Sequence, residues 1–357
     1  MTLALPMKRE EAWRWFAAQA VEEAVAAPSL AAEVDPASLF VEGDGVRLVF
    51  VDGVLQGAGD LGPITVEPLD ISTDHPLGRR ARGTGWRLSL GADHVAGAVQ
   101  IVHVATGGDN HLPGEIVLAE DAAASVTETF VGGGWTNRLT RIRLGRSARL
   151  MRAVRILGDE GFVSLRDEAE VAGGASLVST FLAQGRGSRI DVAATLIGEG
   201  AFAEVGGALL ARETDVQEAA VVIRHEAPNC MSRQVWRLLA ADKAQASAAA
   251  RVEVARDAQK TDGMQSLRGL LLDRTATVNL KPELEIFADD VKCAHGATVG
   301  ELDRNALFYL ESRGLPPAHA RALLSRAFVG DALERIGPQA AREAFVADAD
   351  SWLGAAL

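Results

Sequence analysis

The sequence predicts a mainly β protein, in which a parallel β-helix is flanked by a helical segment at each end. Three observations lead to this fold class. Between Val41 and Leu302, short segments alternate apolar and polar residues and are separated by Gly, Asp and Asn, the pattern of strands and turns. Alanines recur in this region at intervals of about 25 residues, which is typical of a solenoid. Before and after this region, apolar residues follow the period of an α-helix.

Residues 1–60 are expected to form an N-terminal helical segment and a short hairpin. Glu10 and Glu11 lie in the first turn of the helix, where negative charge suits the helix dipole. Pro28 ends the helix, and the stretch RLVFVDGVL (residues 47–55) is expected to form the hairpin. The apolar face of the helix repeats every three or four residues. It consists of Trp13, Phe16, Ala17, Ala20, Val21, Ala24 and Val25.

Residues 61–302 are expected to form the parallel β-helix core. Four stretches between residues 114 and 211 resemble one another, because each has a strand, a corner of small residues built around alanine, and a second strand. The six-residue pattern of a left-handed hexapeptide β-helix is not found, and a β-sandwich is the structural alternative. The expected corner alanines are Ala124, Ala148, Ala175, Ala201, Ala250, Ala276 and Ala297.

Residues 303–357 return to a helical pattern. The first helix is expected to end at Gly314, a residue type favoured just after a helix. Pro316 and Pro317 open the second helix, where a missing N–H group costs little, and Asp331 is a candidate cap for another turn. The second helix has an apolar face of Ala320, Leu323, Leu324, Ala327 and Phe328, and the final helix has one of Phe345, Val346, Ala349, Trp352 and Leu353.

Composition and charge exclude several classes of function. The net charge is −12, and no cluster of Lys and Arg suggests binding to nucleic acid or to an anionic membrane. The N-terminal stretch has no apolar signal core, and no segment reaches the roughly 20 apolar residues that span a bilayer. The chain is therefore expected in the cytoplasm, where its two cysteines, Cys230 and Cys293, are not expected to form a disulfide.

Sequence motifs for nucleotide chemistry and hydrolysis are absent. No phosphate-binding loop, dinucleotide-binding glycine motif, zinc-protease motif or serine-hydrolase elbow occurs. A β-helix polysaccharide lyase or hydrolase is an enzymatic alternative. Asp289 and Asp290 are adjacent, however, so on a strand they face opposite ways and cannot act unaided as a facing carboxylate pair. The chain is not expected to be an enzyme.

Cys293 and His295 are the leading candidate site. At positions i and i+2 of a strand they share one face. A thiolate and an imidazole suit iron, copper or zinc, but a full tetrahedral site needs about four ligands, so other side chains or another protein would have to complete it. Alternatively, Cys293 packs as a small apolar residue and His295 bonds a backbone group at a corner.

Two other polar groups receive structural interpretations. His225 and Cys230 flank Pro228 and Asn229, which is the composition of a turn and not a ligand spacing. The stretch ARDAQKTDGMQS (residues 255–266) is dense in polar side chains. It is expected to form a solvated face, although a polar ladder inside the fold is possible. Its polar residues are Gln259, Lys260, Thr261, Asp262 and Gln265.

Several stretches together resemble the SufB/SufD family of iron–sulfur cluster assembly proteins. They are LKPELEIFADDVKCAHGATVGELD (280–303), DAQKTDGMQSLRGLLL (257–272), HEAPNCMSRQ (225–234), LFYLESRGLPPAHARALLSRAF (307–328) and LPMKREEAWRW (5–15). The matches are dense from residue 225 to 330, and the short N-terminal segment with a single Cys-x-His looks more like SufD than SufB. The resemblance implies that the parallel β-helix is right-handed.

The resemblance also implies partners and roles. A SufB-like sister subunit and a SufC-like ABC-type ATPase are expected, and a homodimer is possible when the chain is alone. Cys293 and His295 would help form a transient iron–sulfur cluster shared with the sister subunit, and no tightly bound cofactor is expected in the isolated chain. Alternatively, the chain only holds its partners in register. The ATPase would bind the C-terminal helices, at Leu307, Phe308, Tyr309, Arg313, Gly314, Leu315, Leu323, Leu324 and Phe328.

Overall fold

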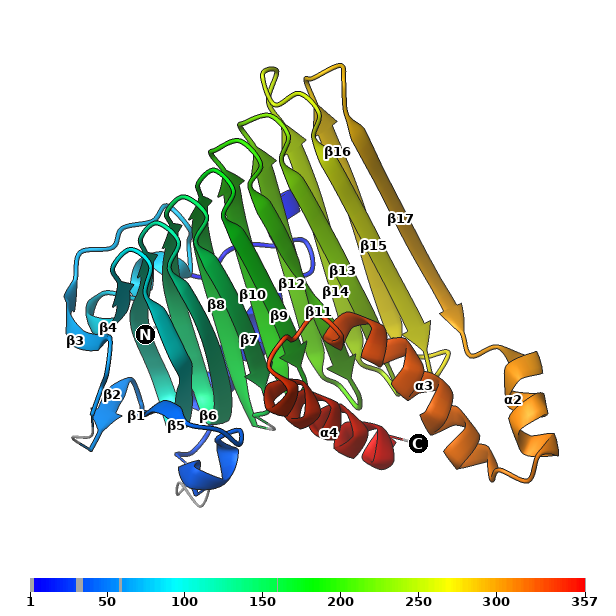
Figure 1. Cartoon of the computed structure of the whole chain (residues 1–357). Coiled ribbons are helices and arrows are strands. Elements are labelled where there is room, and N and C mark those ends of the chain that lie inside the picture. The colour runs from blue at the N-terminus through cyan, green and yellow to red at the C-terminus, as the bar shows by residue number, and fades with distance from the viewer. Residues whose placement is uncertain (1–2, 30–34, 58–59, 159, 357) are drawn as a thin grey trace.

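Parallel strands wind into a flattened solenoid with two faces (Figure 1). The computed structural model describes residues 3–29, 35–57, 60–158 and 160–356. The first face contains β1 (Gly45–Val51), the first halves of β5 (Val95–Leu118) and β6 (Ala123–Leu144), β7 (Arg149–Ile156), β9 (Ser176–Ala183), β11 (Phe202–Ala211), β13 (Met231–Ala240), β15 (Asp262–Leu271) and β17 (Lys292–Glu301). The second face contains β4 (Gly83–Leu90), the second halves of β5 and β6, β8 (Glu160–Val171), β10 (Gly187–Leu196), β12 (Val216–His225), β14 (Gln245–Val254) and β16 (Thr277–Ile286). The expected parallel β-helix with helices at both ends is therefore confirmed.

The corners explain the recurring alanines. A residue with positive φ turns the chain, and the next residue points into the narrow lumen, where a small side chain fits best. Ser147 is followed in this way by the buried Ala148, and Asn229 by the buried Cys230. Of the expected corner alanines, Ala148, Ala175, Ala201 and Ala276 lie at corners. Ala124, Ala250 and Ala297 lie within β6, β14 and β17, so those three predictions are wrong.

The length of one coil changes along the solenoid. In the first half, Ala123 pairs with Arg149 and Arg149 pairs with Ser176, which are steps of 26 and 27 residues. In the second half, Gly187 pairs with Val216 and Val216 pairs with Gln245, both steps of 29 residues. The predicted period of about 25 residues is therefore close in the first half and too short in the second.

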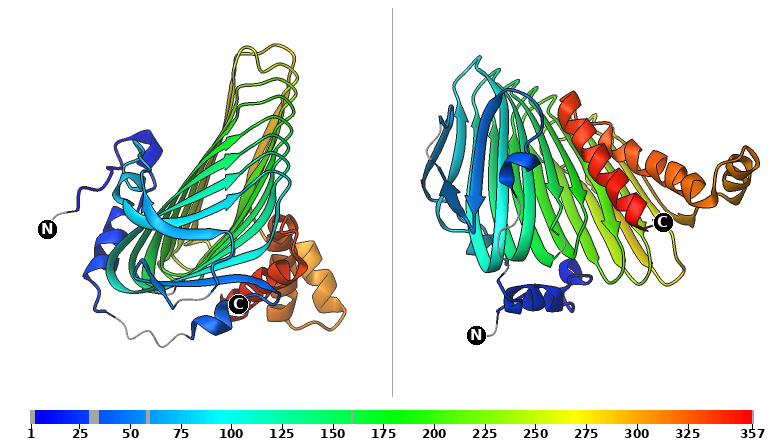
Figure 2. Two further views of the ribbon diagram at one scale, coloured as in Figure 1. Left: turned by 60° about the vertical axis from the view of Figure 1, so that its left-hand side comes forward. Right: turned by 90° about the horizontal axis from the view of Figure 1, so that it is seen from below.

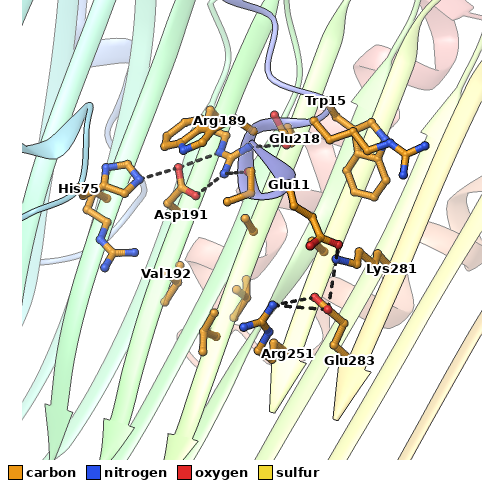
Figure 3. Close-up of a pocket in the computed structure, with 18 of the residues that line it drawn as sticks. Glu11, Trp15, His75, Arg189, Asp191, Val192, Glu218, Arg251, Lys281 and Glu283 are labelled. Atoms are coloured by element: carbon orange, nitrogen blue, oxygen red, sulfur yellow. Dashed lines mark hydrogen bonds and ion pairs between the residues drawn. The ribbon is translucent and has the colours of Figure 1, made fainter. Parts of the chain in front are cut away.

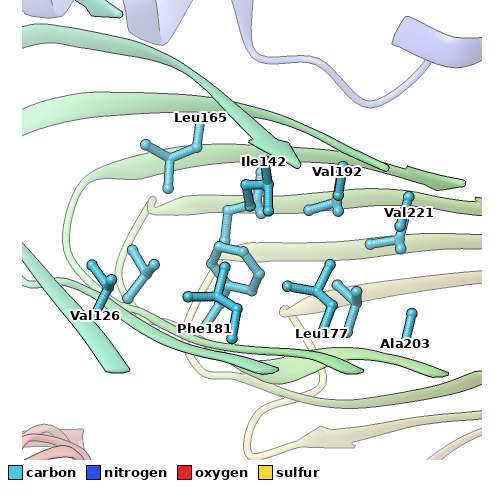
Figure 4. Packing of buried hydrophobic residues seen from close by; sticks show 14 of the residues in the cluster. Val126, Ile142, Leu165, Leu177, Phe181, Val192, Ala203 and Val221 are labelled. Carbon is cyan, nitrogen blue, oxygen red and sulfur yellow. The ribbon is translucent and has the colours of Figure 1, made fainter. Parts of the chain in front are cut away.

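The lumen is filled by alternate side chains from both faces (Figure 4). Val126, Leu177 and Phe181 of the first face meet Leu165 and Val192 of the second in one continuous apolar cluster. Small residues dominate farther along, where β11, β12 and β14 contribute mainly Ala and Val. The two faces must approach closely enough to exclude water, and short side chains permit this approach.

One charged network lies within this lumen. Arg152 of β7 contacts Glu128 of β6 (Nη2–Oε1 2.7 Å) and Asp167 of β8, and Glu128 also contacts His103 of β5 at 3.2 Å. All four side chains are at most 2% exposed. Burial and the neighbouring Arg138 lower the pKa of His103 to about 4, while burial raises the pKa of Asp167 to about 6. The network joins strands of both faces inside the first coils.

Helices cover the two outer faces separately (Figure 2). On the second face, the expected single N-terminal helix is divided into a 3₁₀ turn, η1 (Glu11–Trp13), and a helix, α1 (Ala18–Ala26). Trp13 and Phe16 pack there against Trp135 and Phe162. Two further 3₁₀ turns are η2 (Pro36–Leu39) and η3 (Gly78–Arg80).

The C-terminal helices lie on the first face. They are α2 (Arg304–Ser312), α3 (Pro317–Leu333) and α4 (Gln339–Ala356). Phe345 and Leu333 pack on Leu210 of β11 and Leu239 of β13. Gly314, at φ +92°, follows α2 as expected, but Asp331 lies within α3 and does not cap a turn. In Figure 1, α2 projects away from the solenoid, beyond its last coil.

The two ends of the solenoid differ. At the first end, β1 turns through Asp52 and Gly53 into the antiparallel β2 (Val54–Gln56), so the expected hairpin is confirmed. β3 (Ile64–Leu69) is also antiparallel, and it pairs with β4. At the other end, β16 and β17 pair only with the preceding strands β14 and β15 among the described residues, so their outer edges are open. Most side chains of β17 are exposed.

Candidate functional site

Cys293 and His295 lie on the open edge strand β17. Alternation along the strand places both side chains on the side that faces the end of the lumen, as expected from their spacing. Cys293 is partly buried and packs near Val252 and Val254 of β14, whereas His295 is exposed. Burial raises the pKa of the Cys293 thiol, so the isolated chain favours its protonated form.

The pair does not amount to a complete metal site within one chain. Among the residues that the structure describes, no group of three or more His, Cys, Asp or Glu side chains could hold a metal ion. Asp289 and Asp290 are exposed at the corner before β17, where Asp290 N–H donates to Gln259 Oε1 at 3.0 Å. Any ligands beyond Cys293 and His295 would have to come from outside this part of the chain.

A column of polar side chains lies behind His295. Parallel register aligns His295 of β17 with Gln265 of β15 and Gln234 of β13, all on the inner side of the first face. Gln265 is 4% exposed, and neither of its amide atoms has a hydrogen-bond partner among the described residues; Gln234 Oε1 is also unpartnered. The prediction of a solvated face is therefore wrong for Gln265 and for the buried Thr261, which line the interior.

His225 and Cys230 form a corner, as expected. The two side chains lie at opposite ends of this corner: His225 is the last residue of β12, and Cys230 is the small residue that directly precedes β13. His225 Nε2 lies 2.8 Å from Ser232 Oγ, and the Cys230 thiol donates to the Gly198 carbonyl oxygen at 3.2 Å. Burial lowers the pKa of His225 to about 4, so this imidazole is neutral at pH 7.

The expected ATPase-binding residues occupy α2, the α2–α3 turn and α3. Phe308, Tyr309 and Leu323 are 72%, 57% and 47% exposed, so α2 and α3 present large apolar side chains at their surface. Arg313 lies over the Tyr309 ring at 5.2 Å. Phe328 instead packs against the cluster that joins α3 to the solenoid. Leu307, Leu315 and Leu324 are partly exposed, and Gly314 is exposed.

A family assignment follows from comparison with known proteins. Residues 106–328, more than half of the chain, match the family model for the SUF system FeS cluster assembly, SufBD core domain. This chain belongs to the SufBD family. The matched segment begins near the end of the first half of β5 and ends within α3. None of the helices in the described part of this SufBD protein combines the length and hydropathy needed to cross a membrane.

Individual relatives agree with the SufBD assignment. The iron–sulfur cluster assembly protein SufD of Escherichia coli is 28% identical over 96% of this chain and 88% of its own length. The chloroplastic protein ABCI7 of Arabidopsis thaliana is 31% identical over 62% of this chain and 48% of its own length. A SufBD family protein of Mycobacterium tuberculosis is 26% identical over 79% of this chain and 66% of its own length.

The unpartnered amide of Gln265 leads to a stability prediction for this SufBD chain. Replacing Gln265 by leucine is expected to raise the free energy of unfolding by about 1 to 3 kcal/mol, because an unsatisfied buried amide is removed and the side-chain volume is nearly kept. Urea denaturation measures the change.

A second buried glutamine is the matched control. Gln217 is 0% exposed, and its amide is bonded to Ser188 Oγ and, at 2.6 Å, to the Gly185 carbonyl oxygen. Gln217→Leu is therefore expected to lower the free energy of unfolding, since two partners lose a bond. If Gln265→Leu also lowers it, buried water satisfies the Gln265 amide and the prediction is wrong.

Proposed function

We propose that this chain is a SufD-like scaffold subunit of a SufBCD-type complex. It helps to form a nascent iron–sulfur cluster at the interface with a SufB-like sister chain, while a SufC-like ATPase drives the conformational change. One observation carries the proposal: Cys293 and His295 lie together on an open edge strand, and the described residues supply no third ligand. An incomplete site at an open edge suits a cluster shared between two chains.

The chemistry of the two side chains supports this role. A thiolate and an imidazole both coordinate ferrous iron, which is here a cargo that passes through the complex. In the isolated chain, burial keeps the Cys293 thiol protonated. Iron binding would displace that proton, because only the thiolate is a good ligand. The isolated chain would therefore hold iron weakly, and the sister chain would complete the site.

The C-terminal helices offer the ATPase both a contact surface and a mechanical link. Exposed Phe308, Tyr309 and Leu323 supply the apolar surface. A groove of about 560 Å³ lies between α3 and α4. Arg237 of β13 donates to Asp331 of α3 (Nε–Oδ2 2.8 Å), and α3 and α4 share an apolar cluster with the first face. A force on α3 would therefore reach the sheet that carries Cys293 and His295.

Replacing His295 by alanine is the decisive experiment. The variant is expected to assemble with its SufB-like and SufC-like partners but to carry little or no cluster, since one cluster ligand is lost. Iron and acid-labile sulfide are measured in the anaerobically purified complex. His94→Ala is the matched control, because His94 is exposed at the corner between β4 and β5, near the far end of the solenoid.

A purely structural adaptor is the second candidate function. The observation that favours it is that Cys293 packs against the apolar cluster of Val252 and Val254, as a small apolar residue would. If the His295→Ala complex carries as much iron and sulfide as the wild type, the chain only positions its partners and the chemistry belongs to the sister chain. Without a sister chain, the open edges of β16 and β17 would allow a homodimer.

A further inference from the structure

The N-terminal segment has three aromatic side chains within four residues, namely Trp13, Trp15 and Phe16. Two of them, Trp13 and Phe16, belong to the apolar core. Trp13 and Phe16 are 5% and 0% exposed, and both belong to the cluster that fixes the segment to the second face. Trp15 lies between them in sequence, is not part of that cluster, and is partly exposed. Trp15 therefore keeps part of its indole surface accessible to a partner.

The segment crosses the second face toward its open end (Figure 3). It spans a cavity of about 430 Å³ whose floor includes the small residues Ala220 and Ala249. On one side of the cavity, Arg189 of β10 donates to the Ala12 carbonyl oxygen at 3.0 Å and stacks on Trp13. On the other side, Lys281 Nζ of β16 lies 2.6 Å from Glu11 Oε1. The turn is thus fastened to the last strand of the second face.

Trp15 consequently lies at the rim of the open end. It lines a recess together with Val278, Asn279 and Leu280 of β16 and Ala297, Thr298 and Val299 of β17. The recess therefore combines the indole with both edge strands, one from each face. Any chain that covers the ends of β16 and β17 would contact Trp15 as well.

The chemistry of this rim identifies its occupant as another strand. The outer backbone N–H and C=O groups of β16 and β17 have no strand partner in the described chain, and strand pairing satisfies a row of such groups. β17 begins with Lys292 and ends with Glu301. An antiparallel strand with the same arrangement would place opposite charges at both ends. Under the proposed function, the chain that supplies this strand is the SufB-like sister solenoid.

We propose that Trp15 is an anchor of the interface between this chain and its sister solenoid. The inference deepens the proposed function and rests on it, because it assumes that the sister chain docks on β16 and β17. Complete burial of a partly exposed indole at an interface contributes to affinity, and tryptophan is enriched among residues that dominate binding. The N-terminal segment, fastened across the second face, would hold the indole ready for the partner.

The test compares Trp15→Ala and Trp15→Phe in the complex of the two chains. We expect Trp15→Ala to raise the dissociation constant at least about tenfold, and Trp15→Phe to recover most of that loss. The constant is measured by sedimentation velocity over a dilution series, and an unchanged thermal melt of the single chain shows that the segment still folds. A dissociation constant within about twofold of the wild type for Trp15→Ala would overturn the proposal.

A variant of the edge itself separates this inference from the proposed function. Ala297 is exposed in the middle of β17, so Ala297→Arg leaves the single chain folded but obstructs a docked strand. If Ala297→Arg abolishes the complex and Trp15→Ala does not weaken it, only the role of Trp15 is wrong. If Ala297→Arg also leaves the complex intact, the sister chain docks elsewhere, and both the inference and the proposed interface fail.

Discussion

Replacing Arg152 by methionine is expected to lower the free energy of unfolding by about 3 to 5 kcal/mol. Arg152 is 1% exposed and is the cation between the carboxylates of Glu128 and Asp167. Its removal would leave these carboxylates in the lumen without their main counter-charge, and uncompensated buried charge is among the costliest defects in a protein. Urea denaturation of the isolated chain measures the loss.

Two controls separate lost charge from lost packing. Arg146 and Glu120 form an exposed pair at a corner, with side chains 71% and 47% exposed. Arg146→Met is expected to change stability by less than about 1 kcal/mol. A triple variant with Arg152→Met, Glu128→Gln and Asp167→Asn removes all three charges and is expected to recover much of the loss. A loss below about 1 kcal/mol for Arg152→Met alone would contradict the account of the network.

Acid is expected to destabilise the chain partly through His225. The pKa of this imidazole falls from its ordinary 6.5 to about 4 in the folded lumen. Between these values the unfolded chain binds more protons than the folded chain, so stability rises with pH. The contribution of neutral His225 to the free energy of unfolding is fully present above pH 6.5 and is lost as the pH falls to about 4. Its full size is about 3 kcal/mol.

A glutamine at this position would test the effect. His225→Gln cannot take up the proton, so its free energy of unfolding should fall less steeply than the wild type between pH 6.5 and 4. His103 behaves in the same way, whereas Asp167 and Asp215, whose pKa values burial raises to about 6, oppose the trend. The test therefore compares the variant with the wild type, because the slope of unfolding free energy against pH in either protein alone contains the contributions of all these groups. Equal slopes for the two proteins would show that His225 does not titrate in this range.

The repeat could be predicted from sequence because a corner needs a small residue whatever its neighbours are. Ala148, Ala175 and Ala201 are spaced by one coil and each follows a residue with positive φ. Composition alone could not distinguish these from Ala250, which lies in the middle of β14 where the lumen is narrow. Cys230 occupies a corner in place of alanine. Because alanine occurs within strands as well as at corners, and cysteine can replace it at a corner, the spacing of the alanines did not reveal that the coils become longer.

The candidate pair could be found from sequence, but the residues around it could not. The i, i+2 spacing of Cys293 and His295 determines a shared face on any strand. The inward position of Gln265 depends instead on which side of β15 faces the lumen, and polar residues on both sides of the strand obscured that choice. The place of Trp15 beside β16 and β17 was equally hidden, because it depends on where a separate segment crosses the second face.

The unequal ends of the solenoid limit how many copies can join. A coil with two open ends could add further coils without limit and grow into a filament. Here the first end finishes in β2, which has three residues, and in β3, which contains Pro68 and runs antiparallel to its neighbour. Short strands and proline both discourage further pairing. If other chains pair only with the edges of β16 and β17, an assembly made through strand edges would close at two chains.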